Sequence, residues 1–175
     1  MKKLNRKGFT LVELLAVIII LAIVVGITIP AITNVINDSK NSALGVIVDT
    51  AEDYLADQFA LYNVDTTAAS EAFTDVITGP VTSTMTLTVT ENPTTDTEKK
   101  HNALLQAMGF KLANVSEVKF QISQTGVACV TVTKIPTDSE YYSTKYFTVT
   151  AGVAAPNTSN DVPKYYSRSC SAALN

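Results

Sequence analysis

The apolar residues divide the chain into a continuous apolar stretch near the N-terminus and a more polar remainder. From Leu14 to Ile29 there is no charged residue, and only Gly26 and Thr28 interrupt the apolar run. The segment that starts at Phe9 and ends at Ile29 would be about 31 Å long as a helix. A bilayer has a hydrocarbon core of about 30 Å. The pattern therefore predicts a helix that crosses a membrane.

Beyond Pro30 the apolar residues become one-sided. They recur at spacings of three and four up to Tyr62, and the charged residues mostly fall between them, which is typical of an amphipathic helix. The stripe consists of Ile32, Val35, Ile36, Ala43, Leu44, Ile47, Ala51, Tyr54, Leu55, Gln58, Phe59 and Tyr62. We expect one long, bent helix over residues 9–62, whose second half buries this stripe against the rest of the chain.

The remainder is rich in threonine and alternates between apolar and polar residues, the pattern of half-buried strands. The alternation is clear in residues 85–90 and again in 117–122. A turn predicted at 124–126 leads into a third strand over 127–135, and a fourth is predicted over 146–150. The short connection at Gly126 favours antiparallel pairing.

A short helix and a loop complete the predicted head. Residues 102–113 have apolar positions at helical spacing, and the prolines and asparagines after Thr150 predict a loop. Because the sheet can lay its apolar face on the helix stripe, we predict an α+β fold: a long bent N-terminal helix packed on a small antiparallel sheet. The predicted segments are a basic leader (1–8), a transmembrane and assembly helix (9–30), an amphipathic helix (31–62) and a β-rich head with a C-terminal loop (63–175).

Charge is as unevenly distributed as hydropathy. The first eight residues contain four basic residues and no acidic one, and the chain after them has 9 basic and 16 acidic residues, a formal net charge of −7. Basic residues before an apolar segment stay in the cytoplasm, so the C-terminus should lie outside. An acidic chain repels phosphate backbones, so we expect no general nucleic-acid partner.

Three other interpretations of the apolar segment compete. A secretory signal peptide is usually shorter and ends in a small-residue cleavage site, but Thr28, Ile29 and Pro30 stand at that place. A plain single-pass anchor fits the length but leaves Glu13 unexplained. A buried core helix would not need the basic flank.

Glu13 is the informative residue of the segment. A carboxylate in an apolar membrane helix is costly and usually has a partner and a function. Cleavage after Gly8 would create a positive amine on Phe9, four residues before Glu13 and on the same helical face. This pair could close within one chain or between neighbouring chains. The second arrangement would also set a register for assembly.

The sequence from Lys7 to Leu14, KGFTLVEL, resembles the prepilin cleavage and methylation motif of type IV pilins and pseudopilins. Pro30 is similar to the helix-kinking proline of these proteins. The resemblance implies that Gly8 is the last residue removed by a membrane prepilin peptidase, which can also N-methylate Phe9. It implies that Glu13 contacts the Phe9 amine of a neighbouring subunit, and that Gly26 and Pro30 bend or locally melt the helix on packing.

The function implied by the resemblance is structural, not enzymatic. The chain would start as a single-pass precursor in the bacterial cytoplasmic membrane and become a subunit of an extracellular type IV pilus, a filament used in adhesion and motility. Its partners would be copies of itself, related minor pilins, the prepilin peptidase and the membrane platform of the assembly machine.

Two alternatives to a major pilin stay open. The first is a pseudopilin of a type II secretion or competence DNA-uptake machine, or a minor or tip pilin. The second is a membrane-anchored binding protein that never assembles.

The two cysteines, Cys129 and Cys170, lie far from the apolar segment. An even count in a domain outside the cell favours one disulfide, and pilins often have a comparable C-terminal disulfide; two buried free thiols are the alternative. Cys129 is in phase with Thr131 and Thr133, so it should face away from the helix. Two cysteines and one histidine provide no metal-binding spacing, and we predict no metal and no cofactor.

Other candidate chemistry is weak. His101 is expected to be a solvated residue at a helix start, and there is no catalytic motif. Three acidic loop residues could bind calcium but are better explained as solvated turn residues, since their spacing matches no defined loop. Two tyrosine pairs look exposed and suit either subunit contact or edge packing, and two asparagines begin glycosylation sequons. The acidic loop residues are Asp138, Glu140 and Asp161. The tyrosine pairs are Tyr141 with Tyr142 and Tyr165 with Tyr166, and the sequon asparagines are Asn114 and Asn157.

Overall fold

A computed structural model describes residues 9–79, 83–150, 153–157, 163–167 and 170. The chain divides into two compact units, Met1–Asp38 and Ser39–Asn175. We describe each unit by itself.

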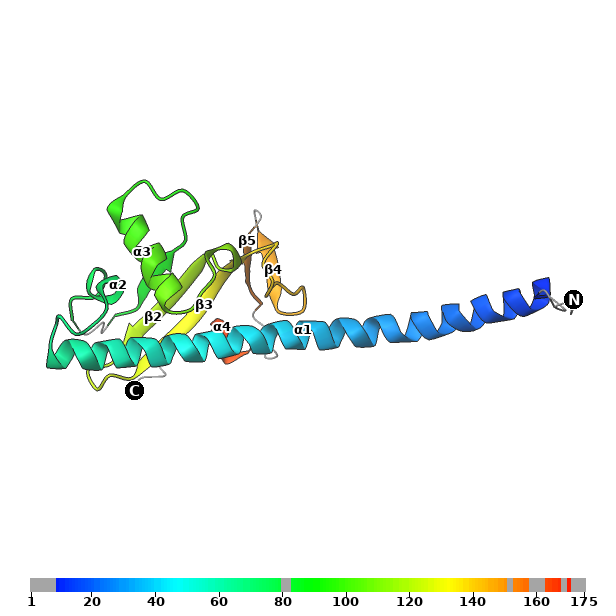
Figure 1. The fold of residues 1–175 in the computed structure, drawn as a ribbon, viewed down its shortest axis with the longest axis horizontal. Helices are drawn as coiled ribbons and strands as arrows, with labels where there is room; N and C mark the ends of the chain where they lie inside the picture. Colours follow the sequence, from blue (N-terminus) through cyan, green and yellow to red (C-terminus); the bar gives the residue numbers. More distant parts are fainter. Residues whose placement is uncertain (1–8, 80–82, 151–152, 158–162, 168–169, 171–175) are drawn as a thin grey trace, which may run out of the picture. The chain divides into compact units, whose positions relative to one another are not determined.

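The first unit is the N-terminal part of helix α1, which runs without interruption from Leu11 to Val64 (Figure 1). The predicted start and end, Phe9 and Tyr62, are each two residues early. Among the described residues, α1 is the one helix long and apolar enough to cross a membrane, by length and composition. The side chains of residues 9–36 are all exposed, so no described residue buries this apolar surface.

The second unit contains the rest of α1, whose inner face is buried. The buried positions, spaced at three and four, are Leu44, Gly45, Val48, Ala51, Leu55 and Phe59. Four of these six were predicted, but Val48 and Gly45 were missed and Ala43 is exposed. The predicted stripe begins too early, since Leu44 is the first residue of α1 that the described part of the chain buries.

The head contains a five-stranded antiparallel sheet in the order β1-β2-β3-β5-β4. The prediction of a long helix followed by a small antiparallel sheet is confirmed. Between β2 and β3 the chain turns at Gly126, whose positive φ of 85° suits a residue without a Cβ. The strands are β1 (Met85–Thr88), β2 (Glu117–Ile122), β3 (Ala128–Pro136), β4 (Phe147–Thr150) and β5 (Val153–Pro156).

Helix and sheet share one core. Fully buried residues of α1 such as Leu55 join the inner side chains of the strands, among them Phe120 and Val132, in a single apolar cluster. Glu52 of α1 also reaches β3, where its Oε1 accepts a hydrogen bond from the backbone N–H of Val130 at 2.7 Å. The predicted two-layer arrangement therefore rests on apolar burial and on this polar contact.

The prediction of a loop after Thr150 was wrong at residues 153–156 and 164–167, and most of the remaining tail lies outside the described residues. Strand β5 follows at Val153 and lies between β3 and β4, where fully buried Ala154 pairs with Ile135 on one side and with Val149 on the other. Its sequence, VAAP, has little β-propensity and no alternation. Pairing with residues distant in the sequence makes this segment a strand.

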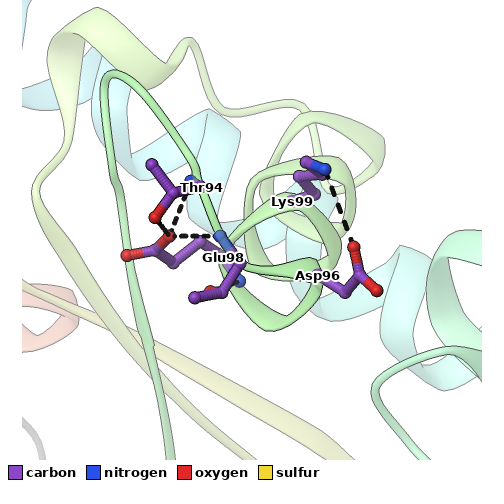
Figure 2. Close-up of polar contacts among 5 residues, drawn as sticks. Thr94, Asp96, Glu98 and Lys99 are labelled. Carbon is purple, nitrogen blue, oxygen red and sulfur yellow. Dashed lines mark hydrogen bonds and ion pairs between the residues drawn. The ribbon is translucent and has the colours of Figure 1, made fainter.

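The short helices also differ from the prediction. Helix α3 covers Asp96–Ala107, a 3-10 turn covers Leu112–Asn114, and single turns form α2 (Glu71–Thr74) and α4 (Lys164–Ser167). The predicted helix 102–113 therefore begins six residues late and runs past the true end at Ala107. A capping box fixes the start: Glu98 accepts the backbone N–H groups of Thr94 and Thr95, each at 2.9 Å (Figure 2), and Thr95 accepts the N–H of Glu98.

The side-chain amide of Asn102 forms hydrogen bonds with the backbone of Thr90, two residues after the end of β1. Its Oδ1 accepts the N–H of Thr90 at 3.3 Å and its Nδ2 donates to the carbonyl of Thr90 at 2.7 Å. Asn102 is only 8% exposed. We expect Asn102→Ala to lower the free energy of unfolding by about 1–3 kcal/mol, because two backbone groups lose their partner. Gln106→Ala, on the exposed side of the same helix, should change it by less than about 0.5 kcal/mol; equal urea midpoints for the two variants would contradict this role.

Candidate processing and assembly site

Of the two residues beside the predicted cut, the structure describes only Phe9. Gly8 lies outside the described residues. Phe9 is 86% exposed, and α1 begins two residues later at Leu11. The side chain after the predicted cut is therefore accessible in this chain.

Thr10 and Glu13 form a reciprocal capping box at the start of α1. The Glu13 Oε2 accepts the backbone N–H of Thr10 at 2.8 Å and its hydroxyl at 2.9 Å. In return the Thr10 Oγ1 accepts the N–H of Glu13 at 3.3 Å. The pattern T-x-x-E is the sequence signature of this motif, but sequence reasoning considered only Phe9 as a partner of Glu13.

The capping box gives Glu13 a role within its own chain. A carboxylate in the first turn also interacts favourably with the positive end of the helix dipole. Since the carboxylate has two oxygens and several lone pairs, a bond to Thr10 leaves capacity for a further donor. The contact between Glu13 and a Phe9 amine stays a prediction, and Thr10 is the residue that would hold the carboxylate beside it.

The predicted kink residues, Gly26 and Pro30, both lie inside α1. Proline has no N–H, so the carbonyl of Gly26, four residues earlier, has no backbone donor in the helix. The flanking threonines bond back to the helix: Thr28 Oγ1 donates to the Val25 carbonyl at 3.3 Å and Thr33 Oγ1 to the Ile29 carbonyl at 3.0 Å. A kink at this point stays a prediction.

The two cysteines are joined. Cys129 on β3 and Cys170 in the tail form a disulfide with a Cα–Cα distance of 5.4 Å. Cys129 pairs in register with Gln121 of β2 and lies outside the apolar cluster that contains Val130 and Val132. The bond closes a loop over 41 positions, long enough to contribute on the order of 4 kcal/mol in the chain-entropy model.

The other predicted candidates do not assemble into a site. Asp161 lies outside the described residues, and Glu140 pairs with Lys111 at 3.5 Å. Within the described parts of the chain, no group of three or more His, Cys, Asp or Glu side chains could hold a metal. His101 lies inside α3, not at its start, and partial burial lowers its pKa.

The side chains of both sequon asparagines form hydrogen bonds within the head. Asn114 is 5% exposed, and its Oδ1 accepts the N–H of Glu140. Asn157 donates through Nδ2 to the Lys145 carbonyl at 3.1 Å and bonds to Thr148. The amide nitrogen of Asn114 is buried, and that of Asn157 is hydrogen-bonded.

The tyrosine pairs are part of the core and do not form an exposed face. Tyr141 and Tyr166 are 6% and 2% exposed, and Tyr142 and Tyr165 pack against the same apolar cluster. Sequence spacing suggested exposure because each pair lies in a loop-like segment. The segment around Tyr165 is instead folded back onto α1.

Burial raises the pKa of Tyr165 to about 12, and the neighbouring Tyr146 and Asp49 add to the shift. An unfolded tyrosine ionises near 10, so the folded chain keeps this proton at pH values where the unfolded chain loses it. The stabilisation is complete below about pH 10 and is lost as the pH rises towards 12. We expect the urea midpoint to fall between about pH 9 and about pH 11, and to fall less in Tyr165→Phe. An equal fall in both proteins would contradict the assignment.

Comparison with known protein families gave a match at the N-terminus of the chain. Residues 3–29 match the family described as the prokaryotic N-terminal methylation motif, the leader signature of type IV pilins. The chain carries this signature. Searches of curated proteins and of solved structures gave no match. The motif supports a type IV pilin-like or pseudopilin precursor, and with the long apolar helix it fits a membrane-anchored chain.

Proposed function

We propose that this chain is a structural subunit of a type IV pilus-like surface filament. Its precursor spans the cytoplasmic membrane with the N-terminus inside. A prepilin peptidase cuts between Gly8 and Phe9 and N-methylates Phe9. The mature chain then assembles with its own copies and with related minor pilins, on the membrane platform of the assembly machine. Adhesion and motility are further proposals that depend on such a filament.

The observation that carries the proposal is the exposed apolar surface of α1, most of which lies within the residues that match the leader signature. Every described side chain from Phe9 to Ile36 is exposed, and most are large and apolar. Such a surface needs a bilayer or other protein around it. A precursor in a membrane satisfies this need before cleavage, and a bundle of the same helices satisfies it after assembly.

Glu13 supports assembly over a permanent anchor. A helix that only anchors a head could be capped by a neutral side chain such as glutamine, without the cost of placing a carboxylate in a bilayer. In a bundle, Glu13 can meet the Phe9 amine of a neighbour while Thr10 holds its carboxylate by two hydrogen bonds. The pair would neutralise both charges and fix the axial register of the two helices.

The first test is mass analysis of the N-terminal peptide in fibres sheared from producing cells. Abundant chains that begin at Phe9, with one added methyl group, are the expected result. Processed chains confined to the cell envelope would favour a pseudopilin or a minor subunit. Chains that begin at Met1 and stay in the membrane would overturn the proposal and leave an anchored binding protein.

A further inference from the structure

The described part of the tail consists of Pro163–Ser167 and Cys170, and it lies against both layers of the head. Within it, α4 is a single turn of four residues. An isolated helical turn of this length is not stable in water. The order of the tail therefore depends on its contacts with the rest of the head.

The first contact is Tyr165 on helix α1. Its hydroxyl donates to the carbonyl of Asn41 at 2.5 Å. A Cβ placed on Gly45 would lie 3.1 Å from Cε1 of the Tyr165 ring and 3.5 Å from its hydroxyl. Glycine is an unfavourable residue inside a helix, and here its missing side chain makes the notch that receives the ring.

The second set of contacts fixes the other end of the tail. Tyr166 is 2% exposed and stands edge-on to Phe147 of β4, with ring centroids 4.7 Å apart. Cys170 is bonded to Cys129 of β3, and its Sγ lies 3.5 Å from the Oγ1 of Thr131. The tail thus connects α1 with two strands of the sheet.

The turn of α1 that meets Tyr165 is intrinsically weak. Ser39, Asn41 and Ser42 precede Gly45, and serine and asparagine side chains compete with the backbone for hydrogen bonds in a helix. Leu44 is the first buried apolar residue of α1. The tail therefore packs against a turn of α1 whose own sequence contributes little helix stability.

We propose that the tail is a disulfide-dependent clasp: the Cys129–Cys170 bond holds Tyr165 in the Gly45 notch, and breaking the bond opens the clasp and frees the turn from Asn41 to Val48. The inference concerns the head alone and does not depend on the filament function. For an exported chain it means that this turn of α1 becomes fully ordered only after the cysteines are oxidised outside the cytoplasm.

Hydrogen exchange of the full chain in detergent micelles tests the coupling. Tris(2-carboxyethyl)phosphine reduces the bond to two thiols: the phosphine gives two electrons and takes the oxygen of one water, whose two protons go to the sulfurs. We expect exchange in residues 41–48 and 164–167 to rise by about tenfold or more, because loop closure no longer holds the tail. Protection in β1 and β2 should persist.

Two outcomes of this experiment would overturn the clasp. If the tail loosens while residues 41–48 stay protected, the disulfide does not control the turn. If every strand loses protection together, the bond is a general stabiliser of the head and not a local device.

Variants of the oxidised chain give an independent test that needs no reductant. Tyr165→Phe removes the bond to Asn41 and should raise exchange in residues 41–48 by about fivefold, the factor that a net hydrogen-bond contribution of about 1 kcal/mol corresponds to. The matched control is Tyr62→Phe, because the Tyr62 hydroxyl also donates to a carbonyl, that of Thr78 at 3.0 Å, elsewhere on the head.

Gly45→Val tests the notch itself. Its side chain would occupy the space of the Tyr165 ring, so the tail should loosen with the disulfide still intact. Residues 164–167 should then exchange faster while β2 keeps its protection. Unchanged exchange at 164–167 in this variant, or an equal effect of Tyr62→Phe and Tyr165→Phe on residues 41–48, would refute the clasp.

Discussion

Replacing Glu13 with valine should leave leader removal intact and lower incorporation into filaments by more than about tenfold. The valine side chain suits a membrane helix, so the precursor should still insert and meet the peptidase. In an apolar bundle, however, the Phe9 amine would lose its counter-charge, and an unpaired charge in such surroundings costs a few kcal/mol. Each 1.4 kcal/mol of lost contact is about a factor of ten in an equilibrium. The measurement is the ratio of sheared to cell-bound processed chain.

Two further variants separate the charge of Glu13 from its capping role. Glu13→Gln keeps an acceptor for the Thr10 N–H, since glutamine also serves in capping boxes, but it removes the charge. Thr10→Val keeps the charge and removes both hydroxyl contacts of the box. We expect Glu13→Gln to fail like the valine variant and Thr10→Val to retain most filaments. Normal filaments from Glu13→Gln would show that capping suffices and would end the register proposal.

The sequence could predict the elements whose patterns are local. The long helix and four of the five strands were predicted to within two residues. For the helix, β1 and β2 the signal was their periodicity, which reflects burial against a partner layer. Strand β5 could not be found, since Ala154 and Ala155 have no strand preference and are placed by pairing with β3 and β4. The start of α3 could have been found from the capping box Thr95-x-x-Glu98, a signal that was present and unused.

The candidate site also combines features that the local sequence predicts with features that depend on tertiary contacts. The leader motif and the position of Glu13 were visible in the sequence, because charge in an apolar run stands out against its surroundings. The T-x-x-E pattern of Thr10 and Glu13 was visible too, but the apolar surroundings of Glu13 pointed to an opposite charge as its partner. The notch at Gly45 was not predictable: it exists only because Tyr165, 120 positions later, lies against that turn. Contacts of this kind depend on the fold of the whole head.

The largest effect on head stability should come from Leu55→Ala, which we expect to lower the free energy of unfolding by about 2–5 kcal/mol. Leu55 is fully buried at the centre of the face that α1 turns to the sheet. Removing three carbons there costs both their transfer from water and the cavity left behind. The loss would be a large part of the stability of an ordinary domain.

Leu61→Ala is the matched control for Leu55→Ala. It makes the same chemical change six positions later on the same helix, where the side chain is 42% exposed, and should shift stability by less than about 0.5 kcal/mol. Urea denaturation of the full chain in detergent, followed by near-UV circular dichroism of its seven tyrosines, measures both. Helix propensity is nearly the same for the two substitutions, so a difference between them isolates burial. Equal losses would mean that α1 does not bury its Leu55 face under the sheet, and the two-layer head would have to be abandoned.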